Sequence, residues 1–176
     1  MGHYETPQHN VLFKDNNFEI REYTEFSIVE YDNEMDPNIN NGFGTLFRYI
    51  SKENTDAEKI AMTIPVIEEV TSTKKKMAFV VPSKYGDQIP QPKDSRLTVK
   101  KFDKGMFAVI VYSGFSSKEK EIKMKNKLAN WLEVKGYKRQ SNYMLAFYNP
   151  PFTPPMFRRN EIMVRVVNSN IVPDLD

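Results

Sequence analysis

The order of predicted elements repeats along the chain, and this repeat constrains the fold more than any single motif. Alternation of apolar and polar residues over 18–31 predicts strands, and apolar spacing over about 38–52 predicts a helix. Further strands are predicted at 60–67 and 76–82. After a proline-rich stretch from Pro82 to Lys93, strands at 97–112, a helix from Ser116 or Ser117 to about Lys135, and strands at about 138–147 and 161–167 follow in the same order.

Two similar strand-helix-strand-strand halves are typical of an α+β fold. We predict a distorted antiparallel β-barrel built from these halves, with two flanking helices. The 176 residues are enough for one domain with a substantial core, so we predict a single domain over 1–176 with flexible ends at 1–8 and 168–176. The groove or mouth of such a barrel is the default place for a ligand.

The two predicted helices each have an apolar face. In the first helix the residues expected in the core are Phe43, Leu46, Phe47 and Ile50. The alternative is that this helix is only partly buried and that its aromatic side chains line a groove. In the second helix the predicted apolar face is Ile122, Leu128, Trp131 and Leu132, flanked by Met124 and Ala129. The glycines of Gly42-Phe43-Gly44 indicate close packing of the first helix on a sheet rather than a phosphate-binding loop.

Composition excludes several classes of function. The net charge of +2 does not indicate a nucleic-acid or anionic-membrane partner, and no apolar run is long enough to span a bilayer. There is no cysteine, and the two histidines, His3 and His9, lie near the N-terminus, which excludes a histidine general base or a histidine-rich metal site from the body of the chain. A paired-carboxylate site of Glu161 with Glu30 or Glu68 is conceivable, but nothing in the sequence fixes their distance, so no catalytic residue and no metal ligand is nominated. We therefore expect a non-enzymatic, cytoplasmic monomer, with hydrolysis of a small molecule as the less favoured alternative.

The proline-rich segment 149–161 contains candidate binding residues. Its proline pairs exclude a helix or a central strand, so it is predicted to be a stiff loop that ends at the strand beginning with Glu161. Arg158 and Arg159 can either pair with a carboxylate of the chain or face an anionic ligand. If Glu161 points inward it must be paired, which makes a structural ion pair more frequent there than an acid or base.

Several segments together resemble the SOUL haem-binding protein family. They are residues 46–51 (LFRYIS) with 59–66 (KIAMTIPV), residues 77–85 (MAFVVPSKY), and residues 148–155 (YNPPFTPP) with 158–161 (RRNE). Residues 4–7 and 18–23 are also similar, so the resemblance extends over about 4–167. It implies a soluble binder of haem or a related tetrapyrrole, and it independently implies the same two-half barrel with two helices.

The resemblance also implies where the ligand binds. In relatives the site lies between the first helix and the proline-rich loop. Carried over to this sequence, the cofactor-binding candidates are Phe43, Phe47, Arg48, Phe79, Tyr148 and Arg158. Either Arg48 or Arg158 is expected to face a propionate. Some relatives ligate haem iron through a histidine that this chain lacks in its body, so haem is expected to bind through apolar contacts and propionate pairing, or through a tyrosine or methionine ligand.

The fold also resembles effector-binding domains similar to the DNA gyrase inhibitory protein. Those domains hold small, often cationic molecules against a buried carboxylate. On this alternative Glu161 is the central binding residue, and the partner is a small cation instead of an anionic tetrapyrrole.

Overall fold

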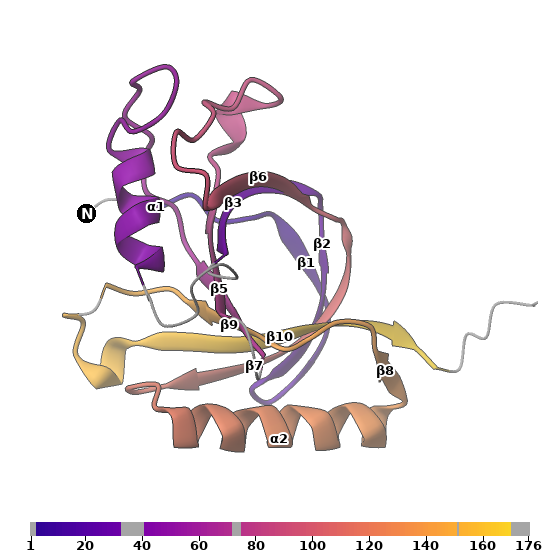
Figure 1. The fold of residues 1–176 in the computed structure, drawn as a ribbon. Coiled ribbons are helices and arrows are strands. Elements are labelled where there is room, and N and C mark those ends of the chain that lie inside the picture. Colours follow the sequence, from indigo (N-terminus) through magenta and orange to yellow (C-terminus); the bar gives the residue numbers. More distant parts are fainter. Residues whose placement is uncertain (1–2, 33–40, 72–74, 151, 170–176) are drawn as a thin grey trace, which may run out of the picture. The chain divides into compact units, whose positions relative to one another are not determined.

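The computed structural model describes residues 3–32, 41–71, 75–150 and 152–169 (Figure 1). It divides into two compact units that are interleaved in sequence. Unit 1 comprises residues 1–8 and 24–104, and unit 2 comprises residues 9–23 and 105–176. In the part of the chain that the structure describes, each unit combines antiparallel strands with one α-helix.

Unit 1 is an antiparallel sheet in the order β4-β5-β3-β6, with helix α1 packed on β3 and β5. Its elements are β3 (Phe26–Asp32), α1 (Gly42–Ile50), β4 (Val66–Val70), β5 (Lys75–Val80), the 3₁₀ turn η1 (Ser83–Tyr85) and β6 (Leu97–Phe102). The buried face of α1 supplies Leu46, Tyr49 and Ile50 to a core that also contains Val29 of β3 and Phe79 of β5. Apolar side chains four residues apart on α1 thus cover one face of the sheet.

Unit 2 is an antiparallel sheet in the order β1-β2-β7-β10-β9, with β8 also paired to β10. Its elements are β1 (His9–Asp15), β2 (Phe18–Tyr23), β7 (Gly105–Ser113), α2 (Lys118–Lys135), β8 (Tyr137–Arg139), β9 (Met144–Phe147), the 3₁₀ turn η2 (Pro155–Phe157) and β10 (Arg159–Asn168). Helix α2 begins after Ser117, whose hydroxyl accepts a hydrogen bond from the Lys120 backbone, and ends at Gly136 with φ of 79°.

The predicted α+β class is confirmed, because the described residues form antiparallel strands and two α-helices. The similarity of the two halves stays a prediction. The pairing adds a feature that the order of elements does not reveal. Strand β2 pairs with β7, and β3 pairs with β6. The first half of the sequence thus gives β1 and β2 to unit 2, and the second half gives β6 to unit 1. The single-domain organisation over 1–176 stays a prediction. Of the predicted flexible ends, residues 1–2 and 170–176 lie outside the described residues, whereas Glu5 forms a parallel bridge with Thr63.

Some predicted elements differ from the structure in their bounds. The strand predicted at 60–67 begins only at Val66, because Pro65 has no N–H to donate to a ladder. The strand predicted at 138–147 is two short strands, β8 and β9. The first helix begins at Gly42, and residues 38–40 of its predicted range lie outside the described residues. On α2, Ile122 is 51% exposed and Met124 is buried, so the predicted apolar face is wrong at Ile122. Neither described helix has the length and apolar composition that crossing a membrane requires.

Candidate functional site

Helix α1 presents an aromatic surface on unit 1. Phe43 and Phe47 lie four residues apart, and their rings stack with centroids 6.1 Å apart and an interplanar angle of 18°. The two side chains are 46% and 50% exposed. The buried ring of Phe79 on β5 meets Phe43 edge-on at 5.5 Å. The predicted core on this helix is therefore correct for Leu46 and Ile50 but wrong for Phe43 and Phe47, which lie outside the buried face of α1 that packs on β3 and β5.

Arg48 follows directly on the same helix. Its guanidinium donates a hydrogen bond to the Thr45 hydroxyl at 3.2 Å and lies 3.7 Å from a carboxylate oxygen of Glu53. The Arg48 side chain is 48% exposed and that of Glu53 is 61% exposed, so water screens the pair and it contributes only about 0–1 kcal/mol. A ligand carboxylate can therefore replace Glu53 at little cost.

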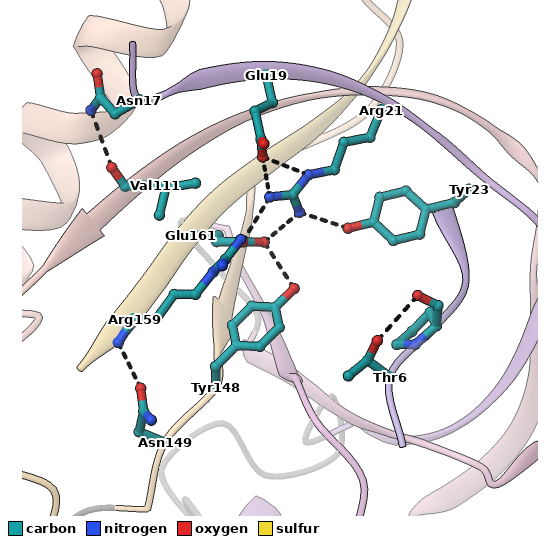
Figure 2. A network of polar contacts seen from close by, with 11 residues as sticks. Thr6, Asn17, Glu19, Arg21, Tyr23, Val111, Tyr148, Asn149, Arg159 and Glu161 are labelled. Atoms are coloured by element: carbon teal, nitrogen blue, oxygen red, sulfur yellow. Dashed lines mark hydrogen bonds and ion pairs between the residues drawn. The ribbon is translucent and has the colours of Figure 1, made fainter. Parts of the chain in front are cut away.

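A buried ion pair lies in the other unit, between β2 and β10 (Figure 2). Arg21 and Glu161 are both 0% exposed, and two parallel hydrogen bonds of 2.7 and 2.8 Å join the guanidinium to the carboxylate. Arg21 also donates to the carboxylate of Glu19 and, at 2.8 Å, to the Tyr23 hydroxyl. The arrangement satisfies the requirement that a buried charge be paired.

Glu161 also accepts hydrogen bonds from a residue of its own strand β10 and from a residue directly after β9. The Arg159 guanidinium donates to Oε2 at 3.0 and 2.8 Å, and the Tyr148 hydroxyl donates to Oε1 at 2.9 Å. The expectation that an inward-facing Glu161 is paired is thus confirmed. An effector-binding role for Glu161 would need a carboxylate open to a ligand cation, whereas here two arginines already occupy it.

Strand alternation explains why these polar groups meet. β7 pairs with β2 on one edge and with β10 on the other, so β7 lies between the strands that carry Arg21 and Glu161. Side chains two residues apart share a face. The opposite face of these strands contributes its apolar side chains to the core beneath α2: Ile20, Ala108, Ile110, Ile162 and Val164.

The charges of this network shift the titration of its members. Burial by itself would raise the pKa of Glu161, but hydrogen bonds and charge from Arg21 and then Arg159 outweigh it and hold that pKa below its usual value. Burial, followed by the negative charge of Glu161, raises the pKa of the Tyr148 phenol. Tyr148 therefore stays protonated and donates to Glu161 at neutral pH.

The predicted site residues fall into two groups. Phe43, Phe47, Arg48 and Phe79 belong to unit 1, where the aromatic three are in contact. Tyr148 and Arg158 belong to unit 2. The Arg158 Nε donates to the Thr153 carbonyl at 2.7 Å, and its guanidinium lies 4.6 Å from the centre of the Phe115 ring. The assignment of these six residues to one ligand site stays a prediction.

Two features were missed in the sequence. The alternation over 18–23 predicts a strand but does not mark Arg21 as buried, because its main partner Glu161 is 140 residues away. Unit 1 also has a cleft of about 390 Å³, lined by 5–8, 24–27, 80–83, Gly86, Asp87 and Lys101. Its Lys101 ammonium lies 3.2 Å from Asp87. Across the described ranges, no three or more His, Cys, Asp or Glu side chains gather in a way that could hold a metal ion.

Comparison with known proteins places the fold and the family. A hydrolase from Listeria innocua is similar with a TM-score of 0.60 and 12% identity, over 89% of this chain and 94% of that one. The EcmrR C-terminal domain is similar with a TM-score of 0.61 and 10% identity, over 86% and 97%. At these identities the likeness shows the fold alone, and no curated protein sequence matches. The family model described as "SOUL heme-binding protein" matches residues 4–165, nearly the whole chain, and the chain therefore belongs to the SOUL haem-binding protein family.

Proposed function

We propose that this protein is a cytoplasmic, non-enzymatic binder of haem or a related tetrapyrrole, and that helix α1 provides its main contact. The observation that carries the proposal is the stacked, half-exposed pair of Phe43 and Phe47, supported from below by Phe79. Large aromatic side chains are normally buried, and a pair left open on a helix offers a flat apolar surface. Membership of the SOUL family indicates the class of ligand.

The residues on α1 fit the chemistry of a tetrapyrrole. When bound, the group would supply a planar aromatic face and negatively charged propionates. The ring faces of Phe43 and Phe47 suit the macrocycle, and Arg48, directly after Phe47, suits a propionate because guanidinium binds carboxylates bidentately. The weak Arg48–Glu53 pair leaves this guanidinium available for exchange.

Two side chains that could ligate iron, His9 and Tyr148, already have partners in the structure. The His9 ring packs against Tyr23 with centroids 4.7 Å apart, and the Tyr148 phenol keeps its proton for Glu161. We infer that binding rests on apolar contact and propionate pairing. Metal-free protoporphyrin IX should then bind with an affinity close to that of hemin.

The test is titration of the purified protein with hemin and with protoporphyrin IX, followed by the Soret band. Phe43→Ser with Phe47→Ser should weaken both affinities by roughly tenfold or more, because apolar contact area is lost. The matched control is Ile122→Ser with Val134→Ser, which removes two exposed apolar side chains from α2 and should leave affinity unchanged. A chain that gives no saturable Soret shift with either porphyrin would refute the proposal.

The propionate contact has its own test. Arg48→Glu should weaken binding, whereas Lys52→Glu, the same charge change at an exposed residue just beyond the end of α1, should have a much smaller effect. Arg158→Glu, measured separately, examines the other predicted propionate partner. Equal affinity in Arg48→Glu and the unaltered protein would exclude Arg48 as a ligand contact.

A further inference from the structure

Unit 2 displays a group of large apolar side chains to solvent, here called the apolar tip: Phe115, Phe152, Met156 and Phe157. Their exposed fractions are 59%, 87%, 78% and 68%. Three of them lie in the loop between β9 and β10, and Phe115 lies between β7 and α2. Single exposed apolar residues are normal on a protein surface, whereas several of them on one loop indicate an interaction surface.

Internal hydrogen bonds hold the apolar tip in shape. Within the loop, the backbone N–H of Phe157 donates to the Pro154 carbonyl at 3.0 Å, and that of Arg158 donates to the Pro155 carbonyl at 3.1 Å. The N–H of Gly114 donates to the Pro155 carbonyl at 3.0 Å, which ties the loop to the segment that carries Phe115. Backbone groups that are already bonded, and prolines that have no N–H, lower the cost of moving a loop out of water.

The charge of unit 2 differs from that of the whole chain. Unit 2 has 13 basic and nine acidic residues, a net charge of +4, whereas unit 1 has 12 and 14, a net charge of −2. Helix α2 alone contains six lysines and three glutamates. Its exposed lysines are Lys118, Lys123, Lys125, Lys127 and Lys135. The small overall charge therefore conceals a basic unit.

The basic helix and the apolar tip adjoin each other. Figure 1 shows the β9–β10 loop at the end of its hairpin, close to the first turn of α2. The contact of Arg158 with the Phe115 ring, two residues before the Ser117 cap, gives the same placement. The apolar tip beside the lysines of α2 suits a lipid bilayer, because anionic headgroups there cover an apolar interior.

We propose that unit 2 binds the surface of an anionic lipid bilayer, with the apolar tip entering the headgroup region and the lysines of α2 attracted to the lipid charge. A projecting loop needs no complementary groove in a fluid lipid surface. Burial of the phenylalanines supplies affinity, and the lysines supply a preference for anionic lipid that decreases as salt is added. This association is peripheral and independent of tetrapyrrole binding at α1.

The experiment is cosedimentation of the chain of residues 1–176 with vesicles of phosphatidylcholine and with vesicles of equal parts phosphatidylcholine and phosphatidylglycerol. The protein should bind the mixed vesicles more tightly, and added salt should weaken that binding. Phe152→Ser with Phe157→Ser should lower affinity by roughly tenfold or more. Lys118→Glu with Lys123→Glu should lower binding to mixed vesicles and remove the preference for them.

The control is Val11→Ser with Leu12→Ser, which removes two exposed apolar side chains from β1 and should bind vesicles as the unaltered chain does. Thermal unfolding of each variant verifies that the fold is kept. Failure of the unaltered chain to bind mixed vesicles, or equal binding by the tip variant, would overturn the proposal. So would a concentration-dependent dimer that the tip variant abolishes while vesicle binding persists, because the tip would then be a contact between copies.

Discussion

Arg21 uses all five of its N–H donors inside the sheet of unit 2. Five hydrogen bonds connect it to Glu19, Tyr23 and Glu161, and none of its surface is exposed. Removing a charge of this kind differs from removing a surface charge, because the partner is left buried and unpaired. The Lys101–Asp87 pair of unit 1, with side chains 49% and 92% exposed, is the natural contrast.

We expect Arg21→Met to lower the free energy of unfolding by about 3–5 kcal/mol, because Glu161 keeps a buried charge without its main partner. Lys101→Met should change it by only about 0–1 kcal/mol. Combining Arg21→Met with Glu161→Met should recover much of the loss, because no isolated charge remains between them. Denaturant unfolding of the four proteins measures these differences, and an Arg21→Met protein as stable as the unaltered chain would contradict the ion-pair account.

The same residues predict an acid-sensitive part of stability. The pKa of Glu161 is held below its usual value in the folded chain, so its contribution is present above the unfolded value of about 4.3 and is lost as pH falls through the folded pKa. Glu161→Gln removes this titration. Unfolding free energies measured from neutral to acid pH should therefore fall less steeply for Glu161→Gln, and parallel curves for the two proteins would argue against the shift.

The two glycines of α1, Gly42 and Gly44, differ in how closely other residues pack against them. A Cβ added at Gly42 would lie 3.1 Å from Cδ1 of the buried Tyr31 ring and 3.4 Å from Cβ of Met77. A Cβ at Gly44 would lie 3.6 Å from a terminal nitrogen of Arg48, which is ordinary contact. The interpretation of Gly42-Phe43-Gly44 as a packing feature therefore holds for Gly42, which lets the helix approach β3 and β5.

Substitution of each glycine by alanine should have opposite effects. Gly42→Ala forces the helix away from Tyr31 and should destabilise the protein by about 1–3 kcal/mol. Gly44→Ala adds helix propensity on an exposed position and should stabilise it by about 0.5–1 kcal/mol. Thermal unfolding of the two variants compares them within one helix, and stabilisation by Gly42→Ala would show that no close approach is needed there.

Local patterns predicted the elements better than they predicted the pairings. The α2 limits could be read from Ser117 and Gly136 because caps act within a few residues. The burial of Arg21 could not be predicted from local sequence, because its main partner Glu161 is 140 residues away. Glu161 lies on β10, which is connected to β2 only through β7. Helical spacing predicts Ile122 on the apolar face, but spacing alone does not show which part of that face is covered, and Ile122 is exposed. The spacing of apolar residues is set within one element. Which side chains of different strands meet on one face of a sheet depends on long-range pairing.

Because strands from each half of the sequence pair within the unit built mainly from the other half, each half depends on the other to fold. A fragment of residues 94–176 lacks β2, so β7 loses a partner strand and Glu161 loses Arg21. A fragment of residues 1–93 lacks β6, the partner of one edge of β3. Edge groups and a buried charge left unpaired in this way oppose folding.

We therefore expect neither fragment to unfold cooperatively alone, and we expect the two, refolded together, to associate and regain a cooperative transition. Circular dichroism during thermal unfolding measures this for each fragment and for the mixture. Placing Arg21→Met in the fragment of residues 1–93 should weaken the reassembly, whereas Lys101→Met in the other fragment should not. A cooperative transition of residues 94–176 alone would mean that β7 and β10 are stable without β2, and that the halves of this chain fold as the sequence repeat divides them.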